Sequence, residues 1–211
     1  MTIDLSSVGM ENGQHYESII SSQNKDLKPN AAPIGIICKN KNEIMCRIFK
    51  NSNTLNNIHT QKEFIVNITH DPLYFTLSTI GNLNEDYFNF DDGRAYLKNT
   101  EAYLKCSVKS IKYAIKTNDP IRKAEIGIIN AEVTKIVKND KCVKAPNRSF
   151  YSLIESLVNF TRIDLVDKNQ QEYYIGRLQE SHRVINKVGN KKEKEAIEIL
   201  KKTVKNKGYN I

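Results

Sequence analysis

Two cations and two hydroxyls lie within eight residues, directly before a short predicted helix. Arg47 ends a β-prone run and Lys50 follows it. Ser52 and Thr54 then precede a helical turn predicted at residues 55–60. Cations neutralise phosphate, hydroxyls donate hydrogen bonds to its oxygens, and the free N–H groups of a helix N-terminus attract anions. These residue types indicate a phosphate-binding turn, although an ordinary turn with Ser52 or Asn53 as the helix N-cap explains them too.

A second candidate segment combines small residues with a proline at the start of a predicted strand. Its residues are Asn30, Ala31, Ala32, Pro33 and Ile34. Small side chains let a flat ligand lie close to the backbone, and a proline without an N–H favours a strand edge or an unpaired position. A tight contact within a sheet explains the same residues equally well.

The elements that must position these residues are short strands. Between Tyr16 and about Val137 the chain alternates β-prone runs with polar turns, which predicts strands at residues 31–38, 43–49 and 63–69. The loop of about four residues between the first two of these predicts a hairpin. In the third strand, Phe64, Val66 and Ile68 share one face and Ile65, Asn67 and Thr69 the other, as expected of a barrel wall with a site on one side.

Two longer runs complete the β-rich part. Residues 100–117 fit a helical stripe as well as a strand, and their Val, Ile and Tyr content favours the strand. In the strand predicted at 124–137, one face is expected to carry Ile129, Ala131, Val133 and Val137.

From Asn147 the hydrophobic period becomes helical. Ser149 is expected to cap a first helix with Leu153 and Leu157 inward, and further helices are expected at 168–188 and 191–205, the last with Ile199 inward. The change of period predicts two domains, a β-rich domain at 1–146 and a helical C-terminal subdomain at 147–211.

The charge balance invites a nucleic-acid function, but its distribution disfavours one. The net charge is +8, and the excess lies in residues 98–144 and 187–211. Of the 32 cations 25 are Lys, whereas readers of bases and phosphates rely on the bidentate Arg. Lys residues spread along strands and helices are more typical of a solvated face.

Several other functions lack their motifs. No GxGxxG, GxxxxGK[ST], GxSxG or HExxH pattern occurs. The four Cys and four His residues lack metal-ligand spacing, so we expect no metal site and no disulfide framework. The N-terminus does not read as a signal peptide, and no apolar run approaches the roughly 18 residues that span a bilayer. We therefore expect a cytoplasmic protein that is not attached to a membrane.

The order of these segments resembles the FMN-binding split-barrel proteins. A PNAAPIGI strand, a hairpin and the run EIMCRIFKNSNTLNNIHTQKEFIVNIT follow one another, and the closest likeness is to domain of unknown function 447, a family of largely archaeal flavoproteins. The C-terminal part continues it, with NRSFYSLIESLVNFTR and then HRVINKVGNKKEKEAIEIL. The likeness covers about residues 14–202 and implies an α+β fold, an antiparallel split β-barrel followed by helices.

The resemblance also implies a cofactor and its contacts. The cofactor is FMN, usually held in the cleft of a homodimer, with part of the site contributed by the second copy. Backbone groups of residues 30–34 would flank the isoalloxazine ring. The phosphate would be held by Arg47, Lys50, Ser52 and Thr54, with polar contacts from Asn67 and Thr69.

One departure leaves the activity open. Many flavin reductases of this architecture carry a Gly-Asp-His run on a late strand, and residues 123–128 here have none. The sequence names no catalytic side chain and no electron donor or acceptor. We therefore consider an FMN-dependent oxidoreductase beside a non-catalytic FMN carrier or nucleic-acid-associated barrel; a deazaflavin or pyridoxal-phosphate ligand on the same fold is a third alternative.

Overall fold

A computed structural model describes residues 3–80, 83–116 and 124–211 of the chain. Lys123, part of the region compared above with flavin reductases, lies outside these residues, as does 117–123 of the basic segment 98–144. The chain divides into two compact units, residues 1–146 and 147–211, which we call the barrel unit and the helical unit.

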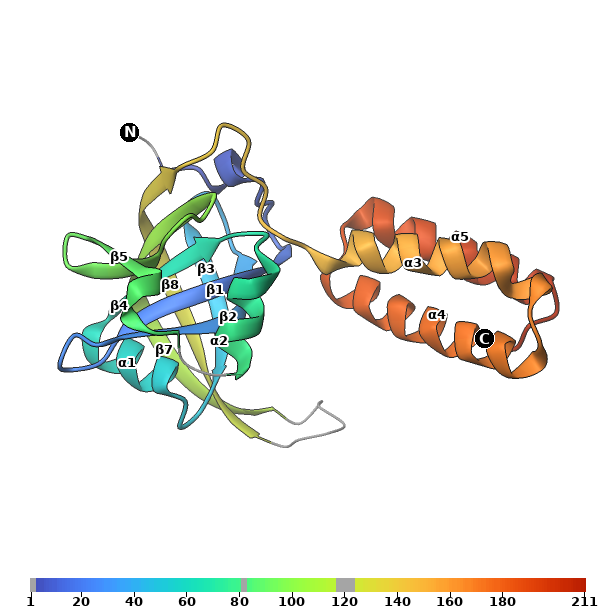
Figure 1. Cartoon of the computed structure of the whole chain (residues 1–211), viewed down its shortest axis with the longest axis horizontal. Coiled ribbons are helices and arrows are strands. Elements are labelled where there is room, and N and C mark those ends of the chain that lie inside the picture. The colour runs from blue at the N-terminus through green and yellow to red at the C-terminus, as the bar shows by residue number, and fades with distance from the viewer. Residues whose placement is uncertain (1–2, 81–82, 117–123) are drawn as a thin grey trace. The chain divides into compact units, whose positions relative to one another are not determined.

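The barrel unit is built from antiparallel strands (Figure 1). Its elements are η1 (Leu5–Val8), β1 (His15–Gln23), β2 (Pro29–Cys38), β3 (Glu43–Phe49), α1 (Asn53–Gln61), β4 (Glu63–Ile68), α2 (Pro72–Ile80), η2 (Glu85–Tyr87), β5 (Phe88–Asp91), β6 (Arg94–Leu97), β7 (Ala102–Lys116) and β8 (Ala124–Lys138). Six strands form a closed barrel in the order β1-β2-β3-β8-β7-β4, with β4 returning to β1. The predicted hairpin between β2 and β3 is present.

The barrel interior is apolar because alternate residues of each strand point inward. Ile44, Cys46 and Ile48 of β3 are buried in the core, while Arg47 between them is exposed. Phe64, Val66 and Ile68 of β4 join the same core, as the alternation predicts. Full burial of one such aliphatic or aromatic side chain stabilises a fold by roughly 1.5–3 kcal/mol.

A bulge in β8 changes which residues face that core. Lys105 pairs with Lys135, yet the next residue of β7 pairs with Val133, so Thr134 is an extra residue in its strand. An extra residue of this kind reverses, for the residues of β8 that follow it, which side chains point into the barrel and which point out. Ile136 therefore packs against the core. The sequence-based prediction that Val137 shares the face of Val133 is wrong for this reason.

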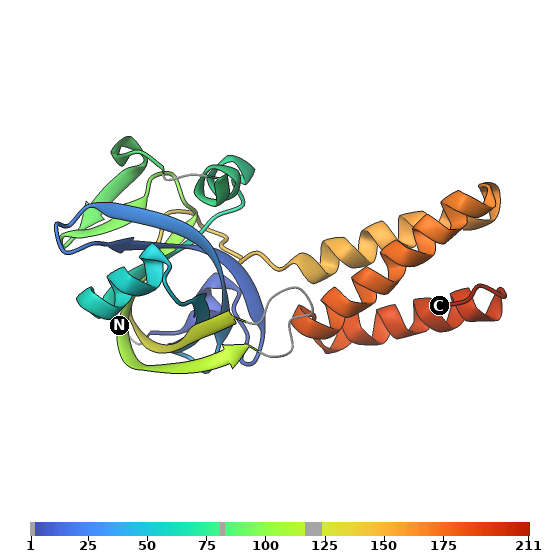
Figure 2. The same cartoon turned by 90° about the horizontal axis from the view of Figure 1, so that it is seen from below.

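The β5–β6 hairpin packs outside the barrel against β1 and β4, and it was not predicted. Its two-residue turn, Asp92-Gly93, has positive φ at both positions, 47° and 73°. Asp-Gly between β-prone runs is a strong hairpin signal that the sequence did offer. The hairpin, α2 and the outer faces of β1 and β2 enclose a second apolar cluster that includes Ile19, Tyr74 and Leu97. Figure 2 shows α1 and α2 on different parts of the barrel surface.

Asn67 joins three strands beneath this hairpin. Its side-chain amide donates to the Ile19 carbonyl at 2.8 Å and to Ser21 Oγ at 2.5 Å, while its Oδ1 accepts from the Leu97 N–H at 2.8 Å. The residue is fully buried. One amide therefore fixes β1, β4 and β6 relative to one another.

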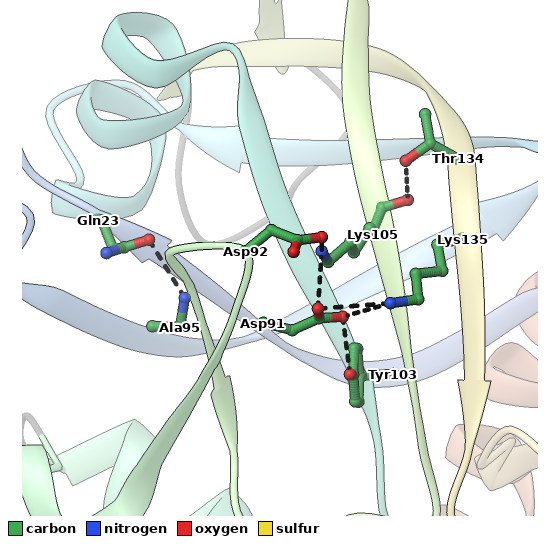
Figure 3. Close-up of polar contacts among 8 residues, drawn as sticks. All are labelled: Gln23, Asp91, Asp92, Ala95, Tyr103, Lys105, Thr134 and Lys135. Atoms are coloured by element: carbon green, nitrogen blue, oxygen red, sulfur yellow. Dashed lines mark hydrogen bonds and ion pairs between the residues drawn. The ribbon is translucent and has the colours of Figure 1, made fainter.

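Asp91 anchors the outer end of the hairpin to the barrel wall (Figure 3). Its carboxylate accepts from Tyr103 Oη at 2.9 Å and from Lys135 Nζ at 3.0 Å, and Lys105 Nζ lies 3.1 Å away. Burial acts to raise the pKa of the Asp91 carboxyl, but the three hydrogen bonds outweigh it and lower that pKa to about 2. A charged group thus attaches the hairpin to both β7 and β8.

The helical unit contains α3 (Arg148–Arg162), η3 (Ile163–Leu165), α4 (Lys168–Val188) and α5 (Lys191–Asn206). The helices share an apolar core that includes Leu153, Ile185 and Leu200. Three expectations are wrong. Asn147, not Ser149, is the N-cap of α3, and its side chain accepts from the Ser149 N–H. Leu157 and Ile199 are exposed, because each is the chain neighbour of a residue on the buried face of its helix and itself points away from that face.

Replacing Asn67 with Ala should lower the free energy of unfolding by about 2–4 kcal/mol, since it leaves the Leu97 N–H and the Ile19 carbonyl buried without their partner. Urea denaturation followed by circular dichroism measures this. Asn89→Ala, at an exposed position of β5, is the matched control and should change the stability by less than about 0.5 kcal/mol. Equal stabilities of the two variants would contradict the role given to Asn67.

Asp91 should also make stability depend on acid pH. Since its folded-state pKa is lowered from 3.8, its stabilisation is present above about pH 4 and is lost as the pH falls toward about 2. Asp91→Asn should reduce the unfolding free energy at pH 7 by about 1.5–3 kcal/mol and flatten that acid loss. Urea denaturation at several pH values measures both effects, with Asp26→Asn in the exposed β1–β2 turn as the control. An unchanged acid profile in Asp91→Asn would refute the anchor.

Candidate functional site

The barrel is open along part of the junction between β2 and β3. Only residues 36–38 of β2 pair with β3, whereas β1 pairs with β2 along its whole length. Residues 47–49 of β3 pair with β8. Among the described strands, none pairs with residues 29–35 of β2 on the side away from β1, and Pro33 lies in this stretch. The unpaired edge of β2 and the neighbouring turn before α1 form what we call the split.

Helix α1 fills the end of the barrel beside this split. Leu55 and Ile58 are buried in the barrel core. Gly127 makes room for the helix, because a Cβ at this position would lie 2.8 Å from a Leu55 methyl carbon. The buried Asn57 amide donates to Ser22 Oγ at 3.2 Å. The helix N-terminus is thereby held at a fixed place next to β2.

Thr54 and Asn30 join the two predicted segments directly. The Asn30 side-chain amide donates to Thr54 Oγ1 at 3.1 Å, across the split. Because this bond uses the hydroxyl oxygen as an acceptor, the hydroxyl proton of Thr54 is left to donate to another group. The N–H groups of Asn53 and Thr54, in the first turn of α1, have no acceptor within the helix.

Ser52 acts mainly as the helix cap. Residues 49–52 form a turn with Asn51 in the left-handed region at a φ of 69°. The Ser52 hydroxyl donates to the Phe49 carbonyl at 2.8 Å and accepts from the Leu55 N–H at 3.2 Å. Both bonds of the Ser52 hydroxyl are those of an ordinary helix cap. A contact between Ser52 and phosphate stays a prediction.

The two cations of this turn differ in their surroundings. Lys50 Nζ lies 2.5 Å from a carboxylate oxygen of Glu125, and the Lys50 N–H donates to the Glu125 carbonyl at 2.9 Å. Arg47 is exposed on β3. Its guanidinium makes no hydrogen bond or ion pair with any residue that the structure describes. Arg47 therefore keeps its full charge available to an anion.

The small residues of β2 are divided between the two faces of the strand. Ala31 is 3% exposed and packs in the outer cluster with Ile19 and Tyr74. Ile34 packs against the barrel core, and its carbonyl accepts from Ser18 Oγ at 2.7 Å. Ala32 and Pro33 are partly exposed. These residues share the unpaired backbone edge of β2, but their side chains do not form one common surface.

Asn67 lies on β4 and Thr69 directly follows it, and β1 separates this strand from the split edge of β2. The amide atoms of Asn67 bond to β1 and β6, as described above. Thr69 is 1% exposed, and its hydroxyl oxygen accepts from the Asp71 N–H at 3.1 Å before α2. The hydrogen bonds of these two side chains thus go to β1, β6 and the turn before α2, and the flavin contacts that the resemblance implies for them stay predictions.

Two residues of the split were missed by sequence reasoning. The role of Gly127 cannot be predicted from its neighbours in the sequence, because its backbone is not left-handed. The glycine is important only because Leu55 packs directly against it. Glu125 is 75 residues from Lys50 in the chain, so only the pairing of β3 with β8 brings them together. Within the described residues no His, Cys, Asp and Glu cluster could hold a metal, and none of the described helices could span a membrane.

The helical unit has an open hollow of about 490 Å³ between α3 and α4. Its lining mixes acidic, basic and aromatic side chains that contact one another. Arg177, for example, donates to Tyr173 Oη at 3.1 Å and lies 3.6 Å from a carboxylate oxygen of Glu155. With its charges satisfied internally, this hollow is a weaker candidate than the split.

Known proteins share both units. The crystal structure of the FMN-bound protein MM1853 from Methanosarcina mazei is similar to this chain with a TM-score of 0.52 and 28% identity, over 94% of this chain and 99% of that one. The uncharacterized protein MJ1453 of Methanocaldococcus jannaschii is 25% identical over 186 residues, 86% of this chain and 94% of the relative.

A family match covers most of the chain. The N-terminal domain of the family described as protein of unknown function (DUF447) matches residues 16–140. The C-terminal part of the same family matches residues 147–202. These matches confirm the resemblance inferred from the sequence, and the six-stranded barrel followed by helices confirms the expected fold. The chain belongs to the DUF447 family of split-barrel proteins.

Proposed function

We propose that this protein binds FMN in the split, with the phosphate at the turn before α1. The observation that carries the proposal is the FMN-bound family member, which is similar over 94% of this chain, together with the free cation and hydrogen-bond donors at the split. In a bound complex the protein would position the flavin and tune its electronics, and the flavin itself would carry one or two electrons.

The phosphate end of FMN fits the turn. Arg47 offers a guanidinium with no partner among the described residues, and Thr54 offers a hydroxyl proton directed by Asn30. The first N–H groups of α1 add backbone donors, and the helix dipole favours an anion there. Lys50 contributes a second cation once it leaves Glu125. This donor set matches an anion with several acceptor oxygens.

The ring end fits the edge of β2. Residues 30–34 have no ladder partner on the side away from β1 among the described strands. Their backbone N–H and C=O groups on that side can therefore bond the edge of a flat heterocycle. Ala32 is small, and Pro33 presents no N–H to leave unsatisfied. Only one side of such a ring would contact this chain.

A second copy of the chain would complete the site, so we propose a homodimer with FMN in its cleft. We further propose oxidoreductase activity, with an electron donor and acceptor still to be identified. The alternative is an FMN carrier without catalysis. A nucleic-acid-associated barrel is less favoured, because Lys105, Lys109 and Lys135 of the basic segment pair with carboxylates of this chain. The cytoplasmic location stays a prediction.

Arg47→Ala should weaken FMN binding by about 1.5–3 kcal/mol, roughly 10- to 150-fold, because it removes a charge-assisted hydrogen bond to phosphate. Riboflavin, which lacks the phosphate, should bind wild type and variant equally. Quenching of flavin fluorescence measures both. Lys41→Ala, which removes another exposed cation before β3, serves as the control. FMN affinity unchanged in Arg47→Ala would remove Arg47 from the site.

The oxidoreductase proposal predicts reduction of the bound flavin by a cellular donor. The FMN-loaded protein, mixed anaerobically with reduced nicotinamide or deazaflavin donors, should lose its visible flavin absorption faster than free FMN under the same conditions. Stopped-flow absorbance measures the rates. Rates no faster than those of free FMN with every donor would favour the carrier function instead.

A further inference from the structure

We propose that Glu125 competes with the phosphate of the ligand for Lys50 and thereby reduces the preference of the site for FMN over riboflavin. The inference rests on the proposed function. It concerns Glu125 of β8, which lies outside the segment 47–54 that the sequence predicts to bind phosphate.

Two contacts hold Glu125 beside the turn. The backbone contact, from the Lys50 N–H to the Glu125 carbonyl at 2.9 Å, continues the pairing of Phe49 with Ile126. The side-chain contact, 2.5 Å from Lys50 Nζ to Glu125 Oε2, places a carboxylate where an anion would approach the turn. Because the strand register fixes the backbone of Glu125, this carboxylate stays close to the turn when a ligand arrives.

The ion pair is exchangeable. The Lys50 and Glu125 side chains are 47% and 54% exposed, so water and ions reach both groups. Exposed pairs of this kind contribute little, about 0–1 kcal/mol. A phosphate group, with more negative charge and more acceptor oxygens than a carboxylate, can therefore displace Glu125 from Lys50. Breaking the Lys50–Glu125 pair costs the free energy that this pair contributed, so the phosphorylated ligand binds more weakly by that amount.

The effect depends on the phosphate. A ligand without one leaves the Lys50–Glu125 pair intact and gains or loses nothing from it. Glu125 thus weakens binding of the phosphorylated ligand alone, and it opposes Arg47 and Thr54, which strengthen that binding. A site with Gln at position 125 would be more selective for FMN than the natural one.

The test compares Glu125→Gln with wild type in fluorescence titrations of FMN and riboflavin. The variant should bind FMN about 2- to 5-fold more tightly, the fold-change that corresponds to a surface ion pair, and riboflavin equally well. Glu132→Gln is the control on the same strand, where Asn42 is the partner, and it should leave both affinities unchanged. Thermal unfolding checks that each variant is folded.

A double-mutant cycle separates competition from simple charge repulsion. In a Lys50→Met background, Glu125→Gln should no longer improve FMN binding, since the cation for which the two anions compete is absent. A gain that persists there, unchanged affinity in the single variant, or weaker FMN binding by Glu125→Gln would each overturn the proposal. If wild type fails to bind FMN at all, the proposed function itself falls, which is a distinct result.

Discussion

The three-residue ladder between β2 and β3 is the constraint on which the rest of the barrel unit depends. After Cys46 the strand β3 stays with β8, while β2 stays with β1, so the wall cannot close by backbone pairing alone. Helix α1 compensates by inserting Leu55 and Ile58 into the core. Gly127 leaves room for Leu55, and the Asn30–Thr54 hydrogen bond then links the two sides that the strands leave apart. The opening is therefore a supported part of the fold and not a defect in it.

The support around this opening is rigid on one side and adaptable on the other. Around β1, β4 and β6 the polar groups are buried and mutually satisfied, with Asn67 at their centre. At the turn before α1 the cations are exposed, and one of them has a partner that solvent can replace. Such a division suits binding of a charged cofactor, because a rigid wall limits the entropy lost on binding while exposed cations can reorganise around it.

Much of the barrel could be predicted because local pattern and final structure agree there. Strand β3 has the predicted bounds, Glu43–Phe49, since its alternation is regular and its flanking turns are polar. The failures have physical causes that no local pattern reveals. The bulge at Thr134 exchanges the faces of Ile136 and Val137, and Leu157 and Ile199 show that an apolar residue at helical spacing need not be buried.

The candidate site could be predicted only in its residue types. Sequence placed Arg47, Ser52 and Thr54 near a helix N-terminus, but the partner of each hydroxyl is set by tertiary contacts. Ser52 is used by the backbone beside it, whereas Thr54 receives its bond from a strand 24 residues earlier. The resemblance implies a flavin contact for Asn67, and the structure shows this amide fully buried beneath the β5–β6 hairpin and bonded to β1 and β6, so that contact stays a prediction.

The burial of three cysteines in the barrel core has a consequence for their oxidation. Burial raises the pKa of the Cys38 thiol, raises that of Cys46 to about 12 and raises that of Cys106 well above its ordinary value. The thiolate is the nucleophile that attacks peroxide, and at neutral pH almost none of these three thiols is deprotonated. The three core thiols should therefore react far more slowly with peroxide than an exposed thiol does, and Cys142 is the exposed cysteine of this chain.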